Sequence, residues 1–318
     1  MISYIIRRLI QALIVVFIVT ILVFVTLRLM PGDPILLYIG ENQAAHMTLE
    51  EINAVRHEFG LDRPIVLQYL DWLKGVFRGD LGKSMFSRNP VVADIARCLP
   101  VTLYLGGMAF ILSTFAGIVL GIISAIRQAK WLDTLVTLLA NIGITVPSFW
   151  LGILLMFFAA IYIKWLPVMG YTSPFDDFSM SLRQAIMPVI CLSTFMLGAT
   201  ARQTRSSMLE VIRQDYIRTA WAMGLREREV IMKHALKNGL LPVLILTGVL
   251  IPTLFGGSVL IETIFNIPGM GRLTTSAIFT KDYTIVQGIV LVMAFVAVTV
   301  NLLVDLLQGW FDPRIRFK

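Results

Sequence analysis

Charged residues are scarce in this chain. Asp, Glu, Lys and Arg make up 15% of its 318 residues, whereas 57% are hydrophobic and the mean hydropathy is +0.80. A water-soluble domain of this length could not bury so much apolar surface, so lipid must solvate much of the chain. The composition therefore indicates a membrane protein and excludes a purely soluble one.

Cysteine and histidine are also rare, which limits the available catalytic and metal chemistry. Cys98 and Cys191 lie far apart and form neither a disulfide framework nor a metal-binding spacing. His46, His57 and His234 show no ligand spacing either. No nucleophile elbow, zinc-protease motif or carboxylate pair lies in or beside an apolar run. We therefore expect no catalytic residues, no metal site and no enzyme activity.

A nucleotide-binding motif is missing as well. Gly82-Lys83-Ser84 resembles the end of a phosphate-binding loop, but that loop needs a further glycine where Phe77 stands. We therefore expect no cofactor in this chain, and any ATP chemistry must come from another subunit.

Long apolar runs are abundant, and six of them are candidate membrane spans. Each is expected to be a helix, because lipid offers no hydrogen-bond partner to a free backbone group. The first run is followed by Arg28 and Pro31 rather than by a small-residue cleavage site, which favours a retained span over a signal peptide. The runs are 9–27, 101–126, 132–163, 184–203, 240–261 and 284–307.

The third run is too long for one straight crossing. At 1.5 Å per residue it would reach roughly 48 Å, against about 30 Å for the hydrocarbon core. Pro147 is expected to kink it. A tilted helix that extends past the bilayer is the favoured interpretation, and a bend that lines a pathway is the alternative. Pro188 and Pro252 raise the same question in the next two runs.

Basic residues gather at the ends of these runs and predict the orientation of the chain. With six spans most of them fall on one side, and positive charge marks the cytoplasm. We therefore expect both termini and the loop 204–239 in the cytoplasm, and the segment 31–99 outside it. The bases on the cytoplasmic side are Arg7, Arg8, Arg127, Lys130, Arg202, Arg205, Arg213, Arg218, Arg226, Arg228, Lys233, Lys237, Arg314, Arg316 and Lys318.

The external segment 31–99 is expected to form a small, partly helical cap. One helix should begin at Thr48, which is followed by acids suited to a first turn. A break is predicted over 60–64, and a second helix over 65–77 with the aromatic anchors Tyr69 and Trp72.

Few charged residues fall inside the runs. Asp305, near the cytoplasmic end of the last run, is interpreted as hydrated or paired with a base rather than as a proton relay. Asn141 is polar, and Glu262 lies near an external end. The lack of a buried series of acids and bases argues against an ion-coupled secondary transporter, which is the alternative function from another class.

The loop 204–239, here called the elbow, predicts two short helices that separate at Gly224. Gly224 suits the left-handed backbone that ends a helix, because it has no Cβ. Acids at 227 and 229 then suit the first turn of the second helix. The apolar stripe of the first helix is Tyr216, Ile217, Ala220 and Met223, and that of the second is Val230, Ile231, His234 and Ala235.

Two interpretations of the elbow fit this pattern about equally. It could lie on lipid headgroups as an interfacial hairpin. It could instead insert a short helix into a groove of a soluble partner.

Several motifs resemble those of ABC importer permeases. Arg218-Thr219-Ala220, Gly224 and His234-Ala235-Leu236 resemble the cytoplasmic "EAA" loop of that superfamily, and the match is closest to its peptide/nickel branch. The long segment after the first run resembles that of the first, B-type, permease subunit. Further matching stretches are Pro31-Gly32-Asp33-Pro34, Gly79-Asp80-Leu81-Gly82, Glu262-Thr263-Ile264-Phe265, Pro268-Gly269-Met270-Gly271 and Asp312-Pro313-Arg314.

The resemblance implies a type I ABC importer permease fold: all-α, six transmembrane helices, cytoplasmic termini and a single permease domain over 1–318. It implies a bacterial or archaeal cell membrane and four kinds of partner: lipid, a second permease subunit, two ATP-binding subunits that hold ATP-Mg, and an extracytoplasmic solute-binding protein, with no nucleic acid. The expected cargo is a peptide or similar small solute. Nickel chelates, glutathione and oligosaccharides are alternatives carried in the same branch.

In that family the short helix of the loop docks into a cleft on the ATP-hydrolysing subunit. Trp221 and Met223 depart from the branch, which often has basic residues there, so the docking is expected to be more apolar. Arg226 and Lys237 stand where relatives have a small polar cap and a proline. The resemblance assigns ATPase coupling to Arg218, Thr219, Ala220, Trp221, Met223, Gly224, His234 and Leu236.

Overall fold

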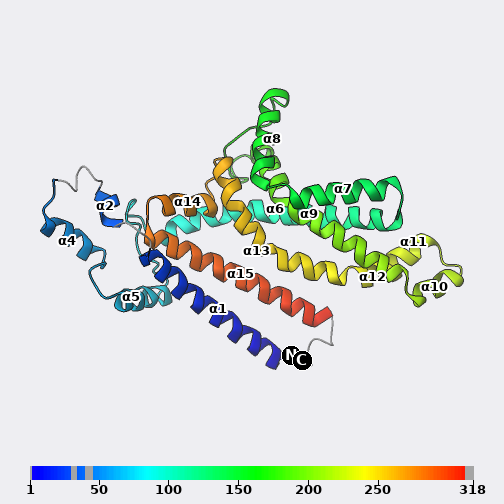
Figure 1. Ribbon diagram of the computed structural model, residues 1–318, viewed down its shortest axis with the longest axis horizontal. Coiled ribbons are helices and arrows are strands. Elements are labelled where there is room, and N and C mark those ends of the chain that lie inside the picture. Colours follow the sequence, from blue (N-terminus) through cyan, green and yellow to red (C-terminus); the bar gives the residue numbers. More distant parts are fainter. Residues whose placement is uncertain (1, 30–33, 40–45, 312–318) are drawn as a thin grey trace. The chain divides into compact units, whose positions relative to one another are not determined.

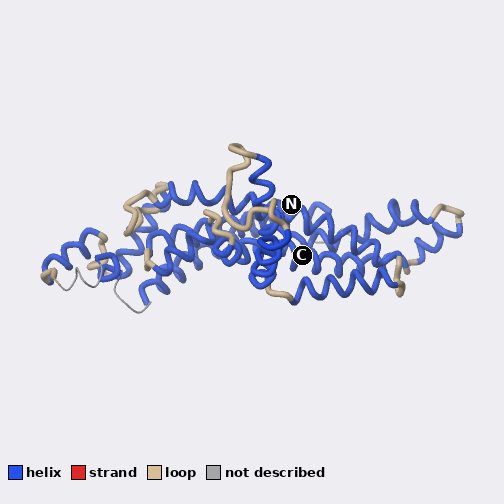
Figure 2. The backbone as a smooth tube through the Cα atoms, turned by 90° about the horizontal axis from the view of Figure 1, so that it is seen from above, coloured by secondary structure: helices blue, strands red, loops and turns tan. Residues whose placement is uncertain are grey.

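The computed structural model describes residues 2–29, 34–39 and 46–311, and within these ranges the chain is helical with no strand (Figure 2). The motif residues Pro31-Gly32-Asp33 and the basic tail at Arg314, Arg316 and Lys318 lie outside the described residues. The chain divides into two compact units. We call them the cap unit, Ile2–Thr102 with Pro268–Thr299, and the elbow unit, Leu103–Ile267 with the chain from Val300 onward.

The cap unit holds the first helices of the chain and the segment around the start of the last one (Figure 1). Its helices are α1 (Ile2–Leu29), α2 (Pro34–Ile39), α4 (Leu49–Glu58), α5 (Ile65–Phe77), the beginning of α6 (Val91–Ile126), α14 (Met270–Phe279) and the beginning of α15 (Tyr283–Phe311).

The elbow unit holds the rest of α6 and α15 and every helix between α6 and α14. Its other elements are α7 (Trp131–Thr145), α8 (Ser148–Tyr162), α9 (Phe178–Ile212), α10 (Asp215–Ala222), α11 (Glu227–Glu229), the π-helix η1 (Val230–Ala235), α12 (Leu236–Gly239) and α13 (Leu241–Ile264).

Among the residues that the structure describes, five helices are long and apolar enough to cross a membrane, and a bent pair would make a sixth span. The five contain Ile5–Leu29, Val91–Ile126, Phe178–Ile212, Leu241–Ile264 and Tyr283–Leu306. The pair is α7 and α8. The predicted six spans are therefore confirmed if the pair counts as one. α9 extends beyond the predicted run 184–203, because Asp177 caps its start and its last turns are packed inside the elbow unit.

The expectation of a tilted helix over 132–163 is wrong. The chain breaks between α7 and α8 and turns by 106°. Val146 (ψ 125°) and Pro147 (ψ 130°) are both extended, because proline cannot donate a helical hydrogen bond and pushes the residue before it out of the α region. Pro188 and Pro252, in contrast, lie inside the continuous helices α9 and α13.

Small residues let the helices of the elbow unit approach closely, as in other membrane proteins. A Cβ on Gly121 of α6 would lie 2.5 Å from the Cβ of Thr204 on α9, and one on Gly117 would lie 2.7 Å from the Cβ of Thr200. On the other side of α9, a Cβ on Gly198 would lie 2.5 Å from a carbonyl oxygen of α7. α9 is therefore the central helix of this unit.

In the cap unit, the helix predicted to begin at Thr48 does so, with a capping box. Thr48 Oγ1 accepts from the N–H of Glu51, and the Glu51 carboxylate accepts from the N–H of Thr48. The break follows at Gly60 (φ 64°). Across this break, His57 Nδ1 lies 2.6 Å from a carboxylate oxygen of Asp62.

The predicted helix over 65–77 is confirmed as α5. Its aromatic residues pack on α1, with ring centres 5.3 Å apart for Phe24 and Tyr69 and 6.1 Å apart for Phe24 and Trp72. Farther along, the buried carboxylate of Asp282 accepts from the hydroxyl of Ser84 at 2.6 Å and from the N–H of Met85 at 3.0 Å. The cap segment is thus joined to the start of the last span by directed hydrogen bonds.

Candidate functional site

The elbow forms a helical hairpin at the end of α9 (Figure 1). α10 begins after Gln214 and ends at Ala222, with Met223 as its C-cap, and the N–H of Gly224 donates to the carbonyl of Trp221 at 2.9 Å. Gly224 has φ +80°, so the predicted left-handed glycine is confirmed. A Cβ there would meet no atom within 4 Å, which means that backbone conformation alone requires glycine.

The inner face of the elbow is a hydrophobic cluster. Ile217 and Ala220 of α10 are buried in it together with three residues of η1 and with Met208 of α9. The η1 residues are Val230, Ile231 and Ala235. η1 is wound as a π-helix rather than the expected α-helix. The cluster fixes α10 against the elbow unit.

The predicted stripe of α10 is only partly right. Tyr216 and Met223 are 44% and 69% exposed. Met223 lies past the last turn of an eight-residue helix, so its side chain leaves the buried face. The Tyr216 hydroxyl is held by a hydrogen bond of 2.8 Å from Asn238. His234 of the second stripe is half-buried rather than buried.

The outer face of α10 is accessible. Arg218, Thr219, Trp221 and Met223 are all exposed there. Thr219 uses its hydroxyl to donate to the Asp215 carbonyl at 3.0 Å, and the Arg218 guanidinium lies 3.6 Å from the Asp215 carboxylate as an exposed ion pair. The indole of Trp221 and the thioether of Met223 are the large apolar groups of this face.

The eight predicted coupling residues thus divide by position. Arg218, Thr219, Trp221, Met223 and Gly224 face outward, and His234 is half-buried. Ala220 is buried and Leu236 packs against the hydrophobic cluster, so these two support the surface rather than form it.

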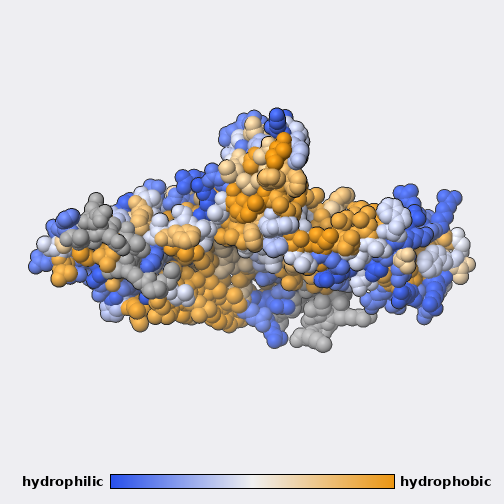
Figure 3. All heavy atoms as spheres, turned by 45° about the horizontal axis from the view of Figure 1, so that its top comes forward, coloured by the Kyte–Doolittle hydropathy of each residue, from blue (hydrophilic) through white to orange (hydrophobic). Residues whose placement is uncertain are grey.

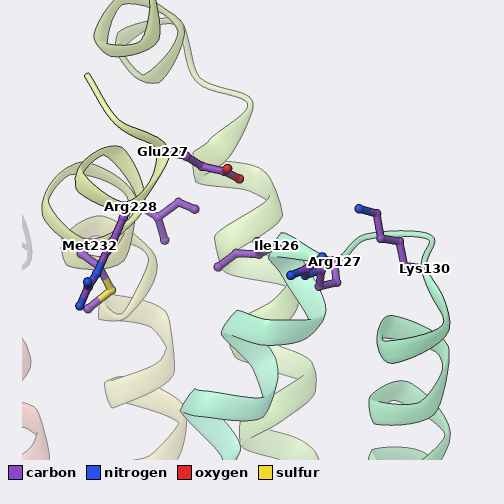
Figure 4. A pocket seen from close by; sticks show the side chains of 7 residues that line it. Ile126, Arg127, Lys130, Glu227, Arg228 and Met232 are labelled. Carbon is purple, nitrogen blue, oxygen red and sulfur yellow. The ribbon is translucent and has the colours of Figure 1, made fainter. Parts of the chain in front are cut away.

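A groove runs beside the elbow, where it faces the turn between α6 and α7 (Figure 4). Its volume is about 390 Å³. Three basic residues and one acid line it, so its charge is net positive. Its lining residues are Ile126, Arg127, Lys130, Glu227, Arg228, Ile231 and Met232. Figure 3 shows hydrophilic side chains gathered over this end of the elbow unit, beyond the apolar surface of its long helices.

An ion pair that the sequence analysis missed lies beneath the elbow. Arg205 of α9 donates from Nε and Nη2 to the two carboxylate oxygens of Asp133 at 2.6 and 2.9 Å. Asp133 is buried, and it also accepts from the hydroxyl of Ser124 at 2.5 Å and from the N–H of Ala129 at 3.0 Å. A lone acid in the first turn of an apolar run, next to a basic turn, was the signal that could have identified it.

A hydrogen bond joins α9 to the far end of the elbow. Ser207 Oγ donates to the carbonyl of Gly239 at 2.8 Å, and both groups are buried. The elbow is therefore held to α9 at both ends, and α9 continues from it, unbroken, into an apolar span. α10 is therefore connected to α9 by the hydrophobic cluster as well as through the chain.

Comparisons with known proteins show which family the chain resembles. The profile of the family described as "Binding-protein-dependent transport system inner membrane component" matches residues 117–317, and a profile for the N-terminal part of such membrane components matches residues 1–106. The dipeptide transport system permease protein DppB of Escherichia coli (strain K12) is 39% identical over 342 residues, with 100% of both chains covered. A protein of Brucella abortus (strain 2308) named as a peptide transport system permease is 43% identical over 318 residues, again with 100% of both chains covered.

A solved structure shares the fold. The inward-facing MetNI methionine ABC transporter contains a chain that matches with a TM-score of 0.57 and 16% sequence identity. The match covers 69% of this chain and 96% of that chain.

Proposed function

Because the chain belongs to the family of binding-protein-dependent transport system inner membrane components, we propose that it is one of two permease subunits that form the pathway of an ATP-driven peptide importer. Its all-α permease fold and its place as a multi-pass protein of the bacterial inner membrane agree with the expectations from sequence. Members of this family are membrane components of transport systems and not catalytic subunits.

The observation that carries the proposal is the construction of the elbow. Its inner face is packed into a hydrophobic cluster, whereas its outer face leaves Trp221 and Met223 exposed at the end of α10. Large apolar side chains on a rigid short helix are what a groove on a soluble partner would bind. We assign that groove to the ATP-hydrolysing subunits, which supply the ATP-Mg that this chain has no motif to bind.

The coupling mechanism follows from the connection to α9. Closure of the ATPases on ATP would move α10, and the packed elbow would pass that displacement to α9 and α13, which adjoin it in the chain. The spans would then switch from an inward-facing to an outward-facing pathway. ATP drives this switch only through its different affinity for the two states.

Topology and cargo complete the proposal. The termini and the elbow (204–239) lie in the cytoplasm, where ATP is available, and the segment 31–99 lies outside, where a solute-binding protein delivers the cargo. The peptide cargo is supported by relatives that are named for peptide or dipeptide transport.

The test is uptake by proteoliposomes that contain this chain, its companion permease and the ATPases. A labelled dipeptide should accumulate only when ATP is on the elbow side and the binding protein is on the other. Uptake driven by an ion gradient without ATPase subunits would refute the proposal and establish a secondary transporter.

A further inference from the structure

A cavity of about 330 Å³ lies in the cap unit, where the end of α1 meets α5 and the start of α15. Arg28, Trp72 and Gln287 line it from these three helices. Each carries a buried N–H group that has no hydrogen-bond partner among the residues that the structure describes: Nη1 of Arg28, Nε1 of Trp72 and Nε2 of Gln287. A buried donor without a partner is costly, so three around one cavity indicate a missing acceptor.

The three donors are held in place by their surroundings. Nε of Arg28 donates to the side-chain oxygen of Gln68 at 3.1 Å, and the amide nitrogen of Gln68 donates in turn to the carbonyl of Arg63 at 2.8 Å. The guanidinium carbon of Arg28 lies 4.3 Å from the ring centre of Phe24. Gln287 is only 3% exposed. The ring of Trp72 packs on the same Phe24, with ring centres 6.1 Å apart. These contacts hold the three side chains at the cavity.

The charges around the cavity favour an anion. Arg63 and Asp71 also line it, but they lie 3.1 Å apart as an ion pair and neutralise each other. The positive charge of Arg28 is therefore not neutralised by that pair, and the donors of Trp72 and Gln287 are uncharged. A ligand that offers several oxygen acceptors and a negative charge would complete all three.

The cavity lies at the level where lipid headgroups are expected. Arg28 is the last residue but one of the apolar span Ile5–Leu29. On α5, Val66, Leu70 and Phe77 are 68%, 52% and 84% exposed, as in a helix that rests its apolar side on lipid. Trp72, on the same helix, is of a type enriched at the membrane interface.

From these observations we propose that the cavity binds the phosphate group of an anionic phospholipid, with Arg28, Trp72 and Gln287 as its donors. Arg28 supplies the charge, and the indole and amide supply directed hydrogen bonds to the phosphate oxygens. The bound lipid would join α1, α5 and α15. This inference does not depend on the transport function proposed above.

The test uses the variants Trp72→Phe, which removes the indole donor and keeps an aromatic ring, and Gln287→Met, which removes the amide donor and keeps a side chain of similar length, alone and combined. Trp131→Phe, at a position that is 71% exposed in the elbow unit, is the matched control. The full transporter is extracted from vesicles of phosphatidylcholine and phosphatidylglycerol, and native mass spectrometry measures the retained lipid. The delipidated protein is then titrated with short-chain phosphatidylglycerol and, separately, with inorganic phosphate.

We expect the wild type and the control to retain phosphatidylglycerol, and each variant to bind the short-chain lipid about tenfold more weakly. Equal retention by the wild type and the double variant would overturn the proposal. So would inorganic phosphate that binds as tightly as the lipid, because the ligand would then be a free anion. If the double variant loses its helical circular dichroism signal, the single variants decide the question.

Discussion

Removing the charge of Asp133 from its ion pair with Arg205 is the most demanding test of the elbow structure. Asn at position 133 would keep the shape of the side chain, remove its charge and replace one oxygen by an NH2 group. In either orientation of the amide, that group would face a nitrogen donor of Arg205, which is Nη2 now at 2.9 Å from Oδ2 or Nε now at 2.6 Å from Oδ1. At least one hydrogen bond would become a donor–donor contact, and the guanidinium would lose its counter-charge.

The magnitude follows from burial. Removing one partner of a fully buried ion pair costs about 3–5 kcal/mol. The side chain of Asp133 is 7% exposed, but that of Arg205 is 31% exposed, so water partly compensates the stranded guanidinium. We therefore expect Asp133→Asn to lower the free energy of unfolding by about 2–4 kcal/mol. This range lies between the cost of breaking a fully buried ion pair and the cost of losing one hydrogen bond to a charged group.

The assay is thermal unfolding of the purified protein in detergent, with a double-mutant cycle. Glu229→Gln is the matched control, because Glu229 pairs with Lys233 at 3.5 Å on the exposed surface of the same elbow. That change should alter stability by only about 0.5 kcal/mol. In the cycle, Asp133→Asn and Arg205→Gln should be strongly non-additive. Additive effects, or an Asp133→Asn protein as stable as the control, would refute the reasoning.

Four further outcomes are expected. Gly224→Val should cost about 1–3 kcal/mol of backbone strain and reduce ATPase association and uptake, whereas Gly224→Asn, which tolerates the left-handed conformation, should do so far less. Trp221→Ala should reduce the ATPase recovered in a pull-down, and Trp221→Phe should retain most of it; full retention by the alanine variant would contradict an anchoring role. Gly121→Leu should destabilise the elbow unit by about 1–3 kcal/mol or more through overpacking against α9, whereas Gly107→Leu on the same helix, where a Cβ meets no atom within 4 Å, should be tolerated. The pKa of Asp62 is lowered by its hydrogen bond to the neighbouring histidine. The contribution of this pair to the stability of the cap helices should therefore be complete above the unfolded pKa of about 3.9 and be lost as pH falls through the lower folded pKa. Amide exchange in these helices should show the pH dependence, and Asp62→Asn should abolish it.

Local chemistry explains which elements the sequence predicts well. The spans follow from apolar length, because lipid forces any such run into a helix. The cap helix over 65–77 and its neighbour beginning at Thr48 follow from a break and a side-chain cap within a few residues. The left-handed backbone at Gly224 follows from the steric freedom of a single glycine. Each of these depends on neighbours in the chain or on the solvent, both of which can be read without the fold.

Other features depended on how the chain folds back on itself. A proline predicts a perturbation, but the 106° turn between α7 and α8 required the packing of both helices. Which residues of the elbow are buried depended on Met208 and Ala125, which are contributed by α9 and α6.

By itself, then, the sequence determined that this is an all-α membrane protein with a helical elbow broken at Gly224, because solvent and backbone sterics act locally. Only the tertiary structure decided that Asp133 meets Arg205, 72 residues away, and that three unsatisfied donors from α1, α5 and α15 surround one cavity. Such meetings depend on the path of the chain between the partners, and no residue type or spacing encodes that path.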